Sequence, residues 1–554
     1  MQRTNVLLFF LIGLAIGLLV FSVATTRIYS VDPFGLGLAS ALPIAFWIGL
    51  GVLGLVWFFG TKTDWVLAVA LILTVGYLFV APAVIRDPVW LSNSYYPFGE
   101  SSLVNSSGHL VDRVGQPLNS YHSWPLFIYF SSVFTQLTAI STTPLLKYFP
   151  LFIISLCGLI SYLILRMKFS VSQSILGVGI FVASFWFRQQ YFGPPGFGFV
   201  LFLLSLLLIL KYFFSNTSNK TTLAGLFLLV FVATVFTHFL SALMSLVAVF
   251  VLYLSHHLFQ RFTQIKISLN AAPLILLAVI VFLGYNILFT PSFFSYLVRD
   301  FSGLISFEGG LVQESTRIAG SAAQVLNYRS TLAIIALDCA IPLVGILWLS
   351  RKKISRAKIF GDGLNIFWVA LLVVLGVFAV FFQYGPHEGY QRALMFALLP
   401  LSYLSVLTMA KKPKLLVVVI VALLFLNIPA QYGGDSYTLE TKTNISGARF
   451  ITANTPDDIA IFYDFSLLQR YFDPAKNITY ITIGTPPFTS IPNSTTVLNA
   501  VNESDYVILS STSDNYYYYF MQQTPLSKKL NGGSDSLGFN RVYDSEGFIV
   551  LGGR

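Results

Sequence analysis

Apolar residues gather into about thirteen long runs over the first 430 residues, separated mostly by short polar turns. A helix that crosses a membrane needs roughly 20 apolar residues, so we interpret each run as a span, although some are short. The first run has no convincing small-residue cleavage site and further spans follow it, which indicates a retained helix rather than a signal peptide. The predicted spans are 5–25, 37–59, 65–85, 145–165, 173–187, 196–213, 222–238, 240–256, 271–290, 329–349, 365–383, 392–410 and 414–429.

Two long polar segments, 86–144 and 291–328, interrupt these runs. Residues 127–140 of the first segment are apolar, but about 14 residues are few for a span. We therefore predict an interfacial helix there, and a fourteenth span is the alternative. The second segment carries five charged residues and is too long for a simple connector.

The end of the chain has a different pattern. Short strand-like runs alternate with helix-compatible segments, which predicts an α/β domain. The strand-like runs are 458–463, 478–483, 506–509 and 547–551, and the helix-compatible segments include 446–454 and 465–472.

The predicted organisation has three parts. Residues 1–64 form an N-terminal transmembrane hairpin, residues 65–430 form a transmembrane module, and residues 431–554 form the α/β domain. No internal repeat is evident, which disfavours a transporter built from inverted repeats. The fold class that we predict is an all-α polytopic membrane protein of about 13 transmembrane helices with a C-terminal extracytoplasmic α/β domain.

Composition and charge agree with a membrane protein. The chain has 56% hydrophobic and 10% charged residues, which excludes a soluble enzyme and a disordered chain. The net charge of +10 arises in the first 429 residues, where 25 Lys and Arg face 11 Asp and Glu. We interpret this excess as topology and expect no nucleic-acid partner. The two cysteines lie in apolar runs, so neither a disulfide framework nor a thiolate zinc site is expected.

Loop charges predict the orientation. With Met1 on the cytoplasmic side, that side receives 16 basic residues and the outer side nine, as the positive-inside rule requires. Thirteen crossings then place the C-terminal domain outside. We predict an integral protein of the plasma membrane with a cytoplasmic N-terminus.

Four motif-bearing segments follow one another in the module: 107–126, with Ser107-Gly108-His109-Leu110 and Tyr121 to Leu126; Arg188 to Pro195; Thr237 to Ser241; and Glu388 to Pro400. In this order, and after an acidic residue at the top of a helix, they resemble the GT-C superfamily of membrane glycosyltransferases. The similarity covers residues 65–430 and is strongest to prokaryotic, archaeal-like members. It extends distantly to oligosaccharyltransferase catalytic subunits and protein mannosyltransferases.

The resemblance implies transfer of a sugar or glycan from a polyprenyl-phosphate donor to an extracytoplasmic glycan or protein acceptor, in contact with membrane lipid. It does not extend to oligosaccharyltransferase activity. Residues 187–196 contain no Asp-x-Asp, and the C-terminal domain contains no Trp.

Sugar transfer needs a carboxylate near the acceptor to take its proton. Asp87 is our first candidate, because it follows the third predicted span, where the resemblance places the catalytic acid. A helix-end charge at the interface is the alternative. Glu100 and Asp112 lie in the same loop and are further candidates, or solvated loop charges.

The departing phosphate needs a cation. Arg392 starts a predicted span four residues after Glu388, so the two share a helix face, and Arg grips phosphate with two parallel hydrogen bonds. A snorkelling Arg paired with Glu388 is the alternative. Arg188 and Tyr191 lie at another helix mouth, and His238 lies at the outer end of a hairpin, where a phosphate contact and an inter-helix hydrogen bond are both open.

Glu308 and Glu314 are candidate ligands for a divalent metal, Mg or Mn, because hard cations prefer carboxylate oxygens. Solvated loop charges are the alternative, and no other cofactor is expected. Asp338 is the only carboxylate deep inside a predicted span, and we expect it to make a structural hydrogen bond. Two other classes stay open: a transporter or flippase of lipid-linked glycans, and a non-catalytic envelope protein.

Overall fold

The computed structural model of the chain describes a helical bundle and a small sheet. The described residues are 2–26, 35–86, 92–110, 122–140, 142–187, 190–214, 219–263, 271–291, 321–350, 362–381, 385–438, 440–463, 478–481, 501, 503–516, 540–545 and 548–552.

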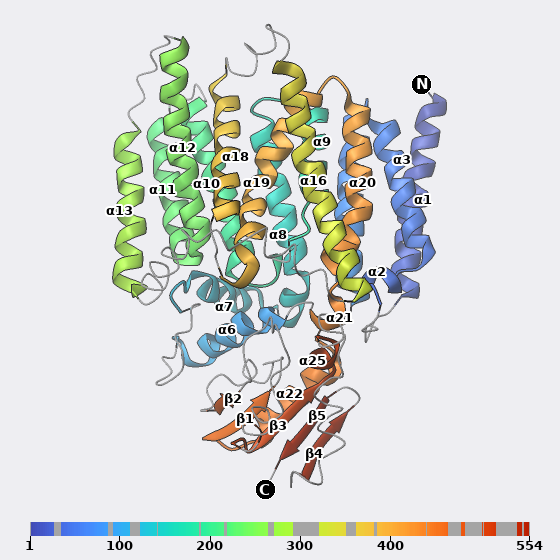
Figure 1. Cartoon of the computed structure of the whole chain (residues 1–554), viewed down its shortest axis with the longest axis vertical. Coiled ribbons are helices and arrows are strands. Elements are labelled where there is room, and N and C mark those ends of the chain that lie inside the picture. The colour runs from blue at the N-terminus through green and yellow to red at the C-terminus, as the bar shows by residue number, and fades with distance from the viewer. Residues whose placement is uncertain are drawn as a thin grey trace.

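Helices that run between two faces make up the bundle (Figure 1). Within the described ranges, eleven helical segments are long and apolar enough to cross a membrane, and α3 and α9 are shorter apolar helices beside them. They match the thirteen predicted spans, so the polytopic fold is confirmed. The helices are α1 (Gln2–Thr25), α3 (Ile44–Gly60), α4 (Asp64–Val75) with its continuations η1 (Gly76–Val80) and α5 (Ala81–Ile85), α8 (Thr142–Leu165), α9 (Val171–Ala183), α10 (Pro194–Phe214), α11 (Lys220–Thr237), α12 (Phe239–Thr263), α13 (Ala272–Phe289), α16 (Ala322–Ser350), α18 (Gly363–Phe381), α19 (Gly385–Met409) and α20 (Pro413–Tyr432).

One end of the bundle carries the other elements, and we call it the domain face. Helix α1 begins at the opposite face, whereas α6 (Tyr95–Ser107), α7 (Leu126–Thr138) and the C-terminal sheet lie at the domain face (Figure 1). Helix α7 leaves Val133 and Leu137 exposed and turns Ser131 toward α6. Its short length and its place across the bundle end agree with the predicted interfacial helix.

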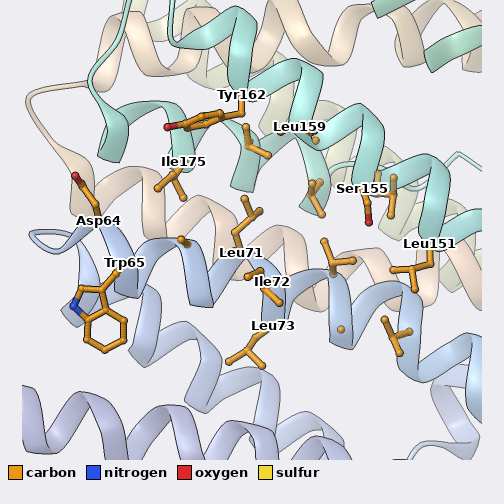
Figure 2. Close-up of a pocket in the computed structure, with 18 of the residues that line it drawn as sticks. Asp64, Trp65, Leu71, Ile72, Leu73, Leu151, Ser155, Leu159, Tyr162 and Ile175 are labelled. Carbon is orange, nitrogen blue, oxygen red and sulfur yellow. The ribbon is translucent and has the colours of Figure 1, made fainter. Parts of the chain in front are cut away.

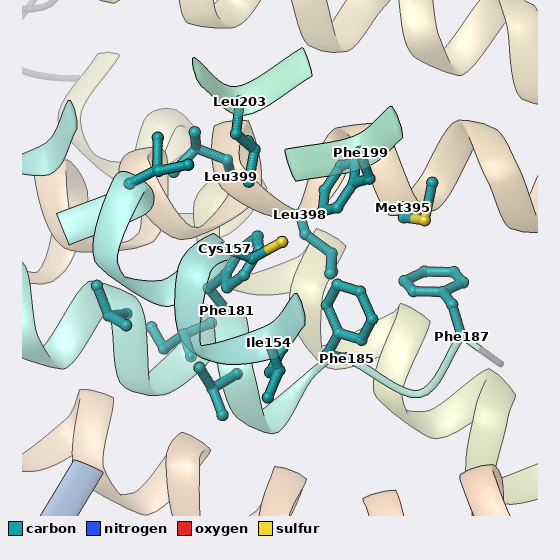
Figure 3. Close-up of a cluster of buried hydrophobic side chains, with 14 of the residues drawn as sticks. Ile154, Cys157, Phe181, Phe185, Phe187, Phe199, Leu203, Met395, Leu398 and Leu399 are labelled. Carbon is teal, nitrogen blue, oxygen red and sulfur yellow. The ribbon is translucent and has the colours of Figure 1, made fainter. Parts of the chain in front are cut away.

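A cluster of aromatic side chains fixes the position of α10 relative to α9 and α19. The ring of Phe199 lies 5.5 Å from Phe396 of α19 and 6.0 Å from Phe185, which follows α9. Figure 3 shows Phe181 of α9, Phe185 and Phe199 near Cys157 of α8. Offset and edge-to-face ring contacts stabilise such a core beyond the area that they bury. The start of α10 is therefore held beside α19 at the domain face.

Helix α9 ends earlier than its apolar pattern predicts. The predicted span reaches residue 187, but the helix stops at Ala183 and residues 185–187 are not helical. The Ser184 hydroxyl donates to Asp338 at 2.7 Å, and Asn427 donates to the Ala183 carbonyl at 2.9 Å. Asn427 thus satisfies a backbone carbonyl that the helix end leaves without an intrahelical donor, which is costly in an apolar medium. The predicted structural hydrogen bond of Asp338 is confirmed.

The C-terminal domain holds a five-stranded mixed sheet, so the predicted α/β architecture is confirmed. The strand order is β2-β1-β3-β5-β4; β1 is parallel to β2 and β3, and β5 is antiparallel to β3 and β4. Strand β4 was not predicted, because its polar edge sequence has no apolar alternation. The elements are α21 (Asp435–Thr438), α22 (Lys442–Asn454), β1 (Ile459–Tyr463), β2 (Ile478–Ile481), β3 (Tyr506–Ser510), α25 (Ser511–Tyr516), β4 (Asn540–Ser545) and β5 (Phe548–Gly552).

The early end of α9 leads to a stability prediction. Replacing Asn427 with Leu removes the donor to the Ala183 carbonyl, and we expect the free energy of unfolding to fall by about 1 kcal/mol. Denaturation in mixed detergent micelles measures the change. Val418→Leu, at a lipid-facing position of the same helix, is the matched control. Equal stability of the two variants would contradict the capping role of Asn427.

Candidate functional site

Arg392 provides a buried positive charge near the domain face. It lies two turns after the start of α19, and 9% of the residue is exposed. Its guanidinium Nη1 lies 3.3 Å from Nε2 of His238. Both Arg392 and Glu388 are on α19, as predicted, although the Glu388 side chain lies outside the described part.

His238 connects α11 to α12 in an extended conformation. Because guanidinium has no acceptor, Nε2 of His238 accepts from Arg392, and Nδ1 donates to the Ser241 hydroxyl at 3.0 Å. Helix α10 approaches closely here: a Cβ on Gly198 would lie 2.8 Å from the His238 Cβ. Only glycine permits this approach without displacement of the turn.

The electrostatics of this pair follow from its burial. Desolvation lowers the pKa of His238 well below its ordinary value, and the charge of Arg392 lowers it further. His238 is therefore neutral near pH 7, and the pair carries the single positive charge of the guanidinium. A fixed cation in low-dielectric surroundings attracts an anion much more strongly than one in water.

The described parts of the first long polar segment form two main helices, α6 and α7, joined by side-chain hydrogen bonds. Ser101 of α6 bonds Ser131 of α7, and one helical turn further Asn105 accepts from Ser132 and Gln136. These contacts hold α6 against α7. The aromatic ring of Phe130 on α7 stacks on Phe197 of α10 at 4.7 Å, although the two residues lie far apart in sequence. The described helices of the first loop are thus packed against each other and against α10.

A carboxylate and a histidine form a second polar pair in this loop. Glu100 of α6 is buried, and its Oε2 lies 3.0 Å from Nε2 of His122. The turn after His122 packs on the bundle: the ring of Trp124 lies 6.3 Å from Phe239, the neighbour of His238. We call Glu100, His122, His238, Ser241 and Arg392 the polar cluster.

A further contact fixes the turn that joins the two pairs. The Tyr285 hydroxyl of α13 donates to the Ser123 carbonyl at 2.7 Å. The loop, the α11–α12 turn and α19 therefore meet at one part of the domain face, where the predictions expected an external site.

Several predicted residues lie outside the described ranges: Asp87, Asp112, Arg188, Glu308 and Glu314. Tyr191 is described and buried, and its ring covers Gly193 just before α10. Within the described ranges, no group of three or more His, Cys, Asp or Glu side chains is arranged to hold a metal ion.

Sequence reasoning missed three polar residues. His122 is the partner of Glu100, Ser241 orients His238, and Gln190 is fully buried, with neither side-chain polar atom hydrogen-bonded within the described part of the chain. A buried amide without a partner is costly, so Gln190 is a candidate for ligand contact. All three lie within the sequence segments on which the resemblance was based, and that position was the only sequence signal for them.

A groove of about 750 Å³ opens between α4, α8 and α9. Asp64 and Trp65 lie at one end and Leu151 lies toward the other, with mostly aliphatic side chains, Tyr162 and Ser155 between them (Figure 2). No residue of the polar cluster lines it. The groove therefore has mostly apolar walls and is separate from the polar cluster.

No protein-family model matches the chain, and no curated protein matches it either. Among solved structures, it is similar to ArnT from Cupriavidus metallidurans in the apo state, at 12% identity and a TM-score of 0.49, over 88% of this chain and 98% of that one. ArnT bound to undecaprenyl phosphate aligns at 12% identity and a TM-score of 0.47, over 86% and 97% of the two chains. Because both TM-scores lie below 0.5, the function is inferred from the residues of this chain.

The lowered pKa of His238 predicts a pH dependence of stability. When the pH falls below 6.5, the ordinary pKa of histidine, His238 takes up a proton in the unfolded chain but stays neutral in the native state. The stability contribution is complete above that value and is lost as the pH falls. We expect the midpoint of thermal unfolding in detergent to drop between about pH 7 and pH 5, and to drop less in His238→Gln. The same substitution at the exposed His109 is the control; equal slopes for wild type and His238→Gln would contradict a neutral His238.

Proposed function

We propose that this protein is a membrane glycosyltransferase. It transfers a sugar or glycan from a polyprenyl-phosphate donor to an extracytoplasmic glycan or protein acceptor. The observation that carries the proposal is the Arg392–His238 pair: a buried guanidinium with a neutral partner, at the end of the bundle where a lipid-linked phosphate meets the membrane surface.

Sugar transfer requires a base near the acceptor and a cation near the departing phosphate. The bond between the sugar and the phosphate oxygen breaks, the acceptor oxygen bonds to the sugar carbon, and the acceptor proton passes to a base. Negative charge grows on the departing phosphate, and Arg392 stabilises it. Because His238 holds one guanidinium nitrogen, the cation is positioned before the donor binds. Arg188, Tyr191 and Glu388 are further proposed contacts of the donor phosphate.

The proposed base is Asp87. Support comes from its neighbour Arg86, which caps the end of α5 at the domain face. Glu100 and Asp112 are the alternatives in the same loop. The hydrogen bond between Glu100 and His122 favours a different task for Glu100, because a buried carboxylate that holds a histidine orients it.

The remaining parts follow from this assignment. The N-terminal hairpin at 1–64 anchors the module at 65–430, and the domain at 431–554 orients the acceptor outside the membrane. The N-terminus lies in the cytoplasm, as the loop charges predict. Glu308 and Glu314 are the proposed ligands if transfer proves to need Mg or Mn.

Arg392 gives the first test of the proposal. With purified protein in lipid, native polyprenyl-phosphate glycolipids and envelope acceptors, we expect Arg392→Gln to lower kcat by about 100-fold and Arg392→Lys to lower it less. Lys411→Gln is the control, since Lys411 is exposed and follows the end of α19 opposite to the one that carries Arg392. Full activity of Arg392→Gln would contradict its role. Movement of glycolipid across the bilayer without transfer would favour a flippase.

Asp87 gives the second test. We expect Asp87→Asn to abolish transfer, because an amide takes up no proton, while donor binding is kept. Glu100→Gln is the matched comparison and is expected to retain part of the activity. Retention of transfer by Asp87→Asn and its loss in Glu100→Gln or Asp112→Asn would move the base to that carboxylate.

A further inference from the structure

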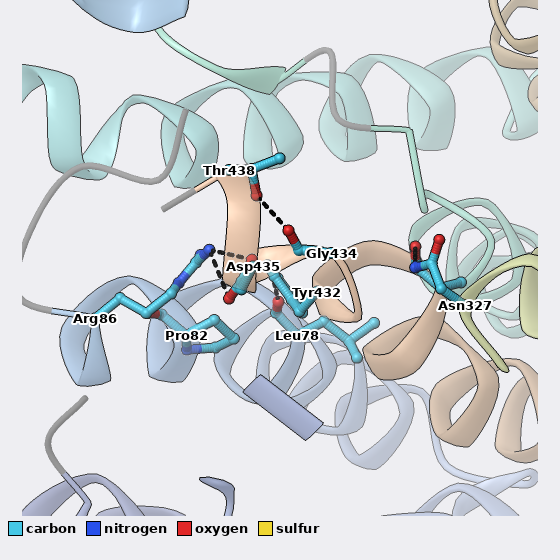
Figure 4. Close-up of polar contacts among 9 residues, drawn as sticks. Leu78, Pro82, Arg86, Asn327, Tyr432, Gly434, Asp435 and Thr438 are labelled. Carbon is cyan, nitrogen blue, oxygen red and sulfur yellow. Dashed lines mark hydrogen bonds and ion pairs between the residues drawn. The ribbon is translucent and has the colours of Figure 1, made fainter. Parts of the chain in front are cut away.

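Arg86 makes an ion pair with the segment that leaves the last membrane helix. Its Nη1 lies 3.4 Å from each carboxylate oxygen of Asp435, and its Nε donates to the Pro82 carbonyl at 3.0 Å (Figure 4). Arg86 is 4% exposed and Asp435 is fully buried. A backbone anchor and a carboxylate thus hold one guanidinium from two sides.

An aromatic residue completes the contact. The Arg86 guanidinium lies 4.6 Å from the ring centroid of Tyr432, the last residue of α20. The Tyr432 hydroxyl donates to the Leu78 carbonyl at 2.6 Å. Four residues after Leu78 stands Pro82, which has no N–H to complete an α-helical hydrogen bond. Tyr432 therefore gives the Leu78 carbonyl a hydrogen-bond donor from a helix distant in sequence.

The end of α20 is itself fixed to the bundle. Asn327 of α16 donates to the carbonyls of Pro429 and Ala430 at 2.7 and 2.8 Å. Gly433 lies against this amide, where a Cβ would stand 3.0 Å from its nitrogen. Three segments distant in sequence, α5, α16 and the start of α21, are thus joined at one point of the domain face (Figure 4).

The two partners of the ion pair lie next to different functional parts. Arg86 directly precedes Asp87 in the chain. Asp435 opens α21, which contacts α25, and α25 follows the carboxyl end of β3 in the C-terminal domain. The ion pair therefore joins the end of α5, where the first loop begins, to α21, the first element of the C-terminal domain.

From this geometry we infer that Arg86 and Asp435 are positioning residues: their ion pair directs the chain into the loop that begins at Asp87 and makes sugar transfer depend on how the C-terminal domain is seated. The inference rests on the proposed function for its effect on rate. The link between the two segments stands on the contacts alone.

The physical ground is the character of buried ion pairs. Such a pair adds little net stability compared with apolar residues, but loss of one partner leaves an uncompensated buried charge. Replacing Asp435 with Asn therefore removes the carboxylate that holds one side of the Arg86 guanidinium, and we expect the chain that follows Arg86 to be held less firmly. The double variant that removes both charges leaves neither charge without its partner, but it also lacks the contact between Arg86 and α21.

The test combines activity with hydrogen exchange on the full-length protein in lipid. We expect Asp435→Asn and Arg86→Gln each to lower kcat at least tenfold with KM for both substrates within about twofold. The double variant is expected to match the single variants in kcat, because both act on one contact. Asp435→Glu is expected to recover part of the rate. A fall in the melting temperature with kcat unchanged would mean a structural role alone and would overturn the inference.

Hydrogen exchange separates this inference from the proposed function. In Asp435→Asn, amides of the peptide covering residues 82–91 are expected to exchange about tenfold faster, with residues 234–242 unchanged. Glu440→Gln is the matched control, because Glu440 is an equally buried carboxylate that bonds Asn444 within the C-terminal domain. Unchanged exchange at 82–91 in Asp435→Asn would overturn the inference whatever the activity. If the wild-type protein transfers no sugar but Asp435→Asn still exchanges faster at residues 82–91, the proposed function is overturned and the link between the two segments stands.

Discussion

The structure depends on one constraint: in an apolar medium every backbone polar group and every charge needs a partner inside the protein. Helix α9 ends at Ala183 because Asn427 takes over its carbonyl. The Leu78 carbonyl, which faces a proline four residues on, receives the Tyr432 hydroxyl instead. In both places a side chain from a helix distant in sequence supplies the hydrogen bond.

The same constraint concentrates polar chemistry at the domain face. Along the spans most side chains are apolar, so a fixed cation is stable only where partners and the membrane boundary meet. Arg392 lies at such a place, with a neutral His238 that takes one hydrogen bond without cancelling the charge. A site for a lipid-linked phosphate needs this combination, since the ligand brings the anion and its chain stays in the membrane.

The packing of the first loop connects this cation to carboxylate chemistry. Helices α6 and α7 hold each other through hydroxyl and amide side chains, and the turn at Trp124 brings the Glu100–His122 pair beside the α11–α12 turn. The C-terminal domain joins the same face through Asp435. The described parts of the first loop, the cation and the start of the C-terminal domain therefore lie at the same face of the bundle.

The sequence by itself determined the polytopic helical fold, the approximate places of its apolar helices, the α/β character of the final domain, and the helix that carries Arg392. These follow from local patterns: apolar run length, alternation, and spacing on one helix. Only the tertiary structure decided that Glu100 bonds His122, that His238 holds Arg392, that Gln190 is buried, and that Arg86 pairs with Asp435. Those contacts join residues that are 22 to 349 positions apart or depend on burial by distant helices, and no local pattern encodes which helices pack together.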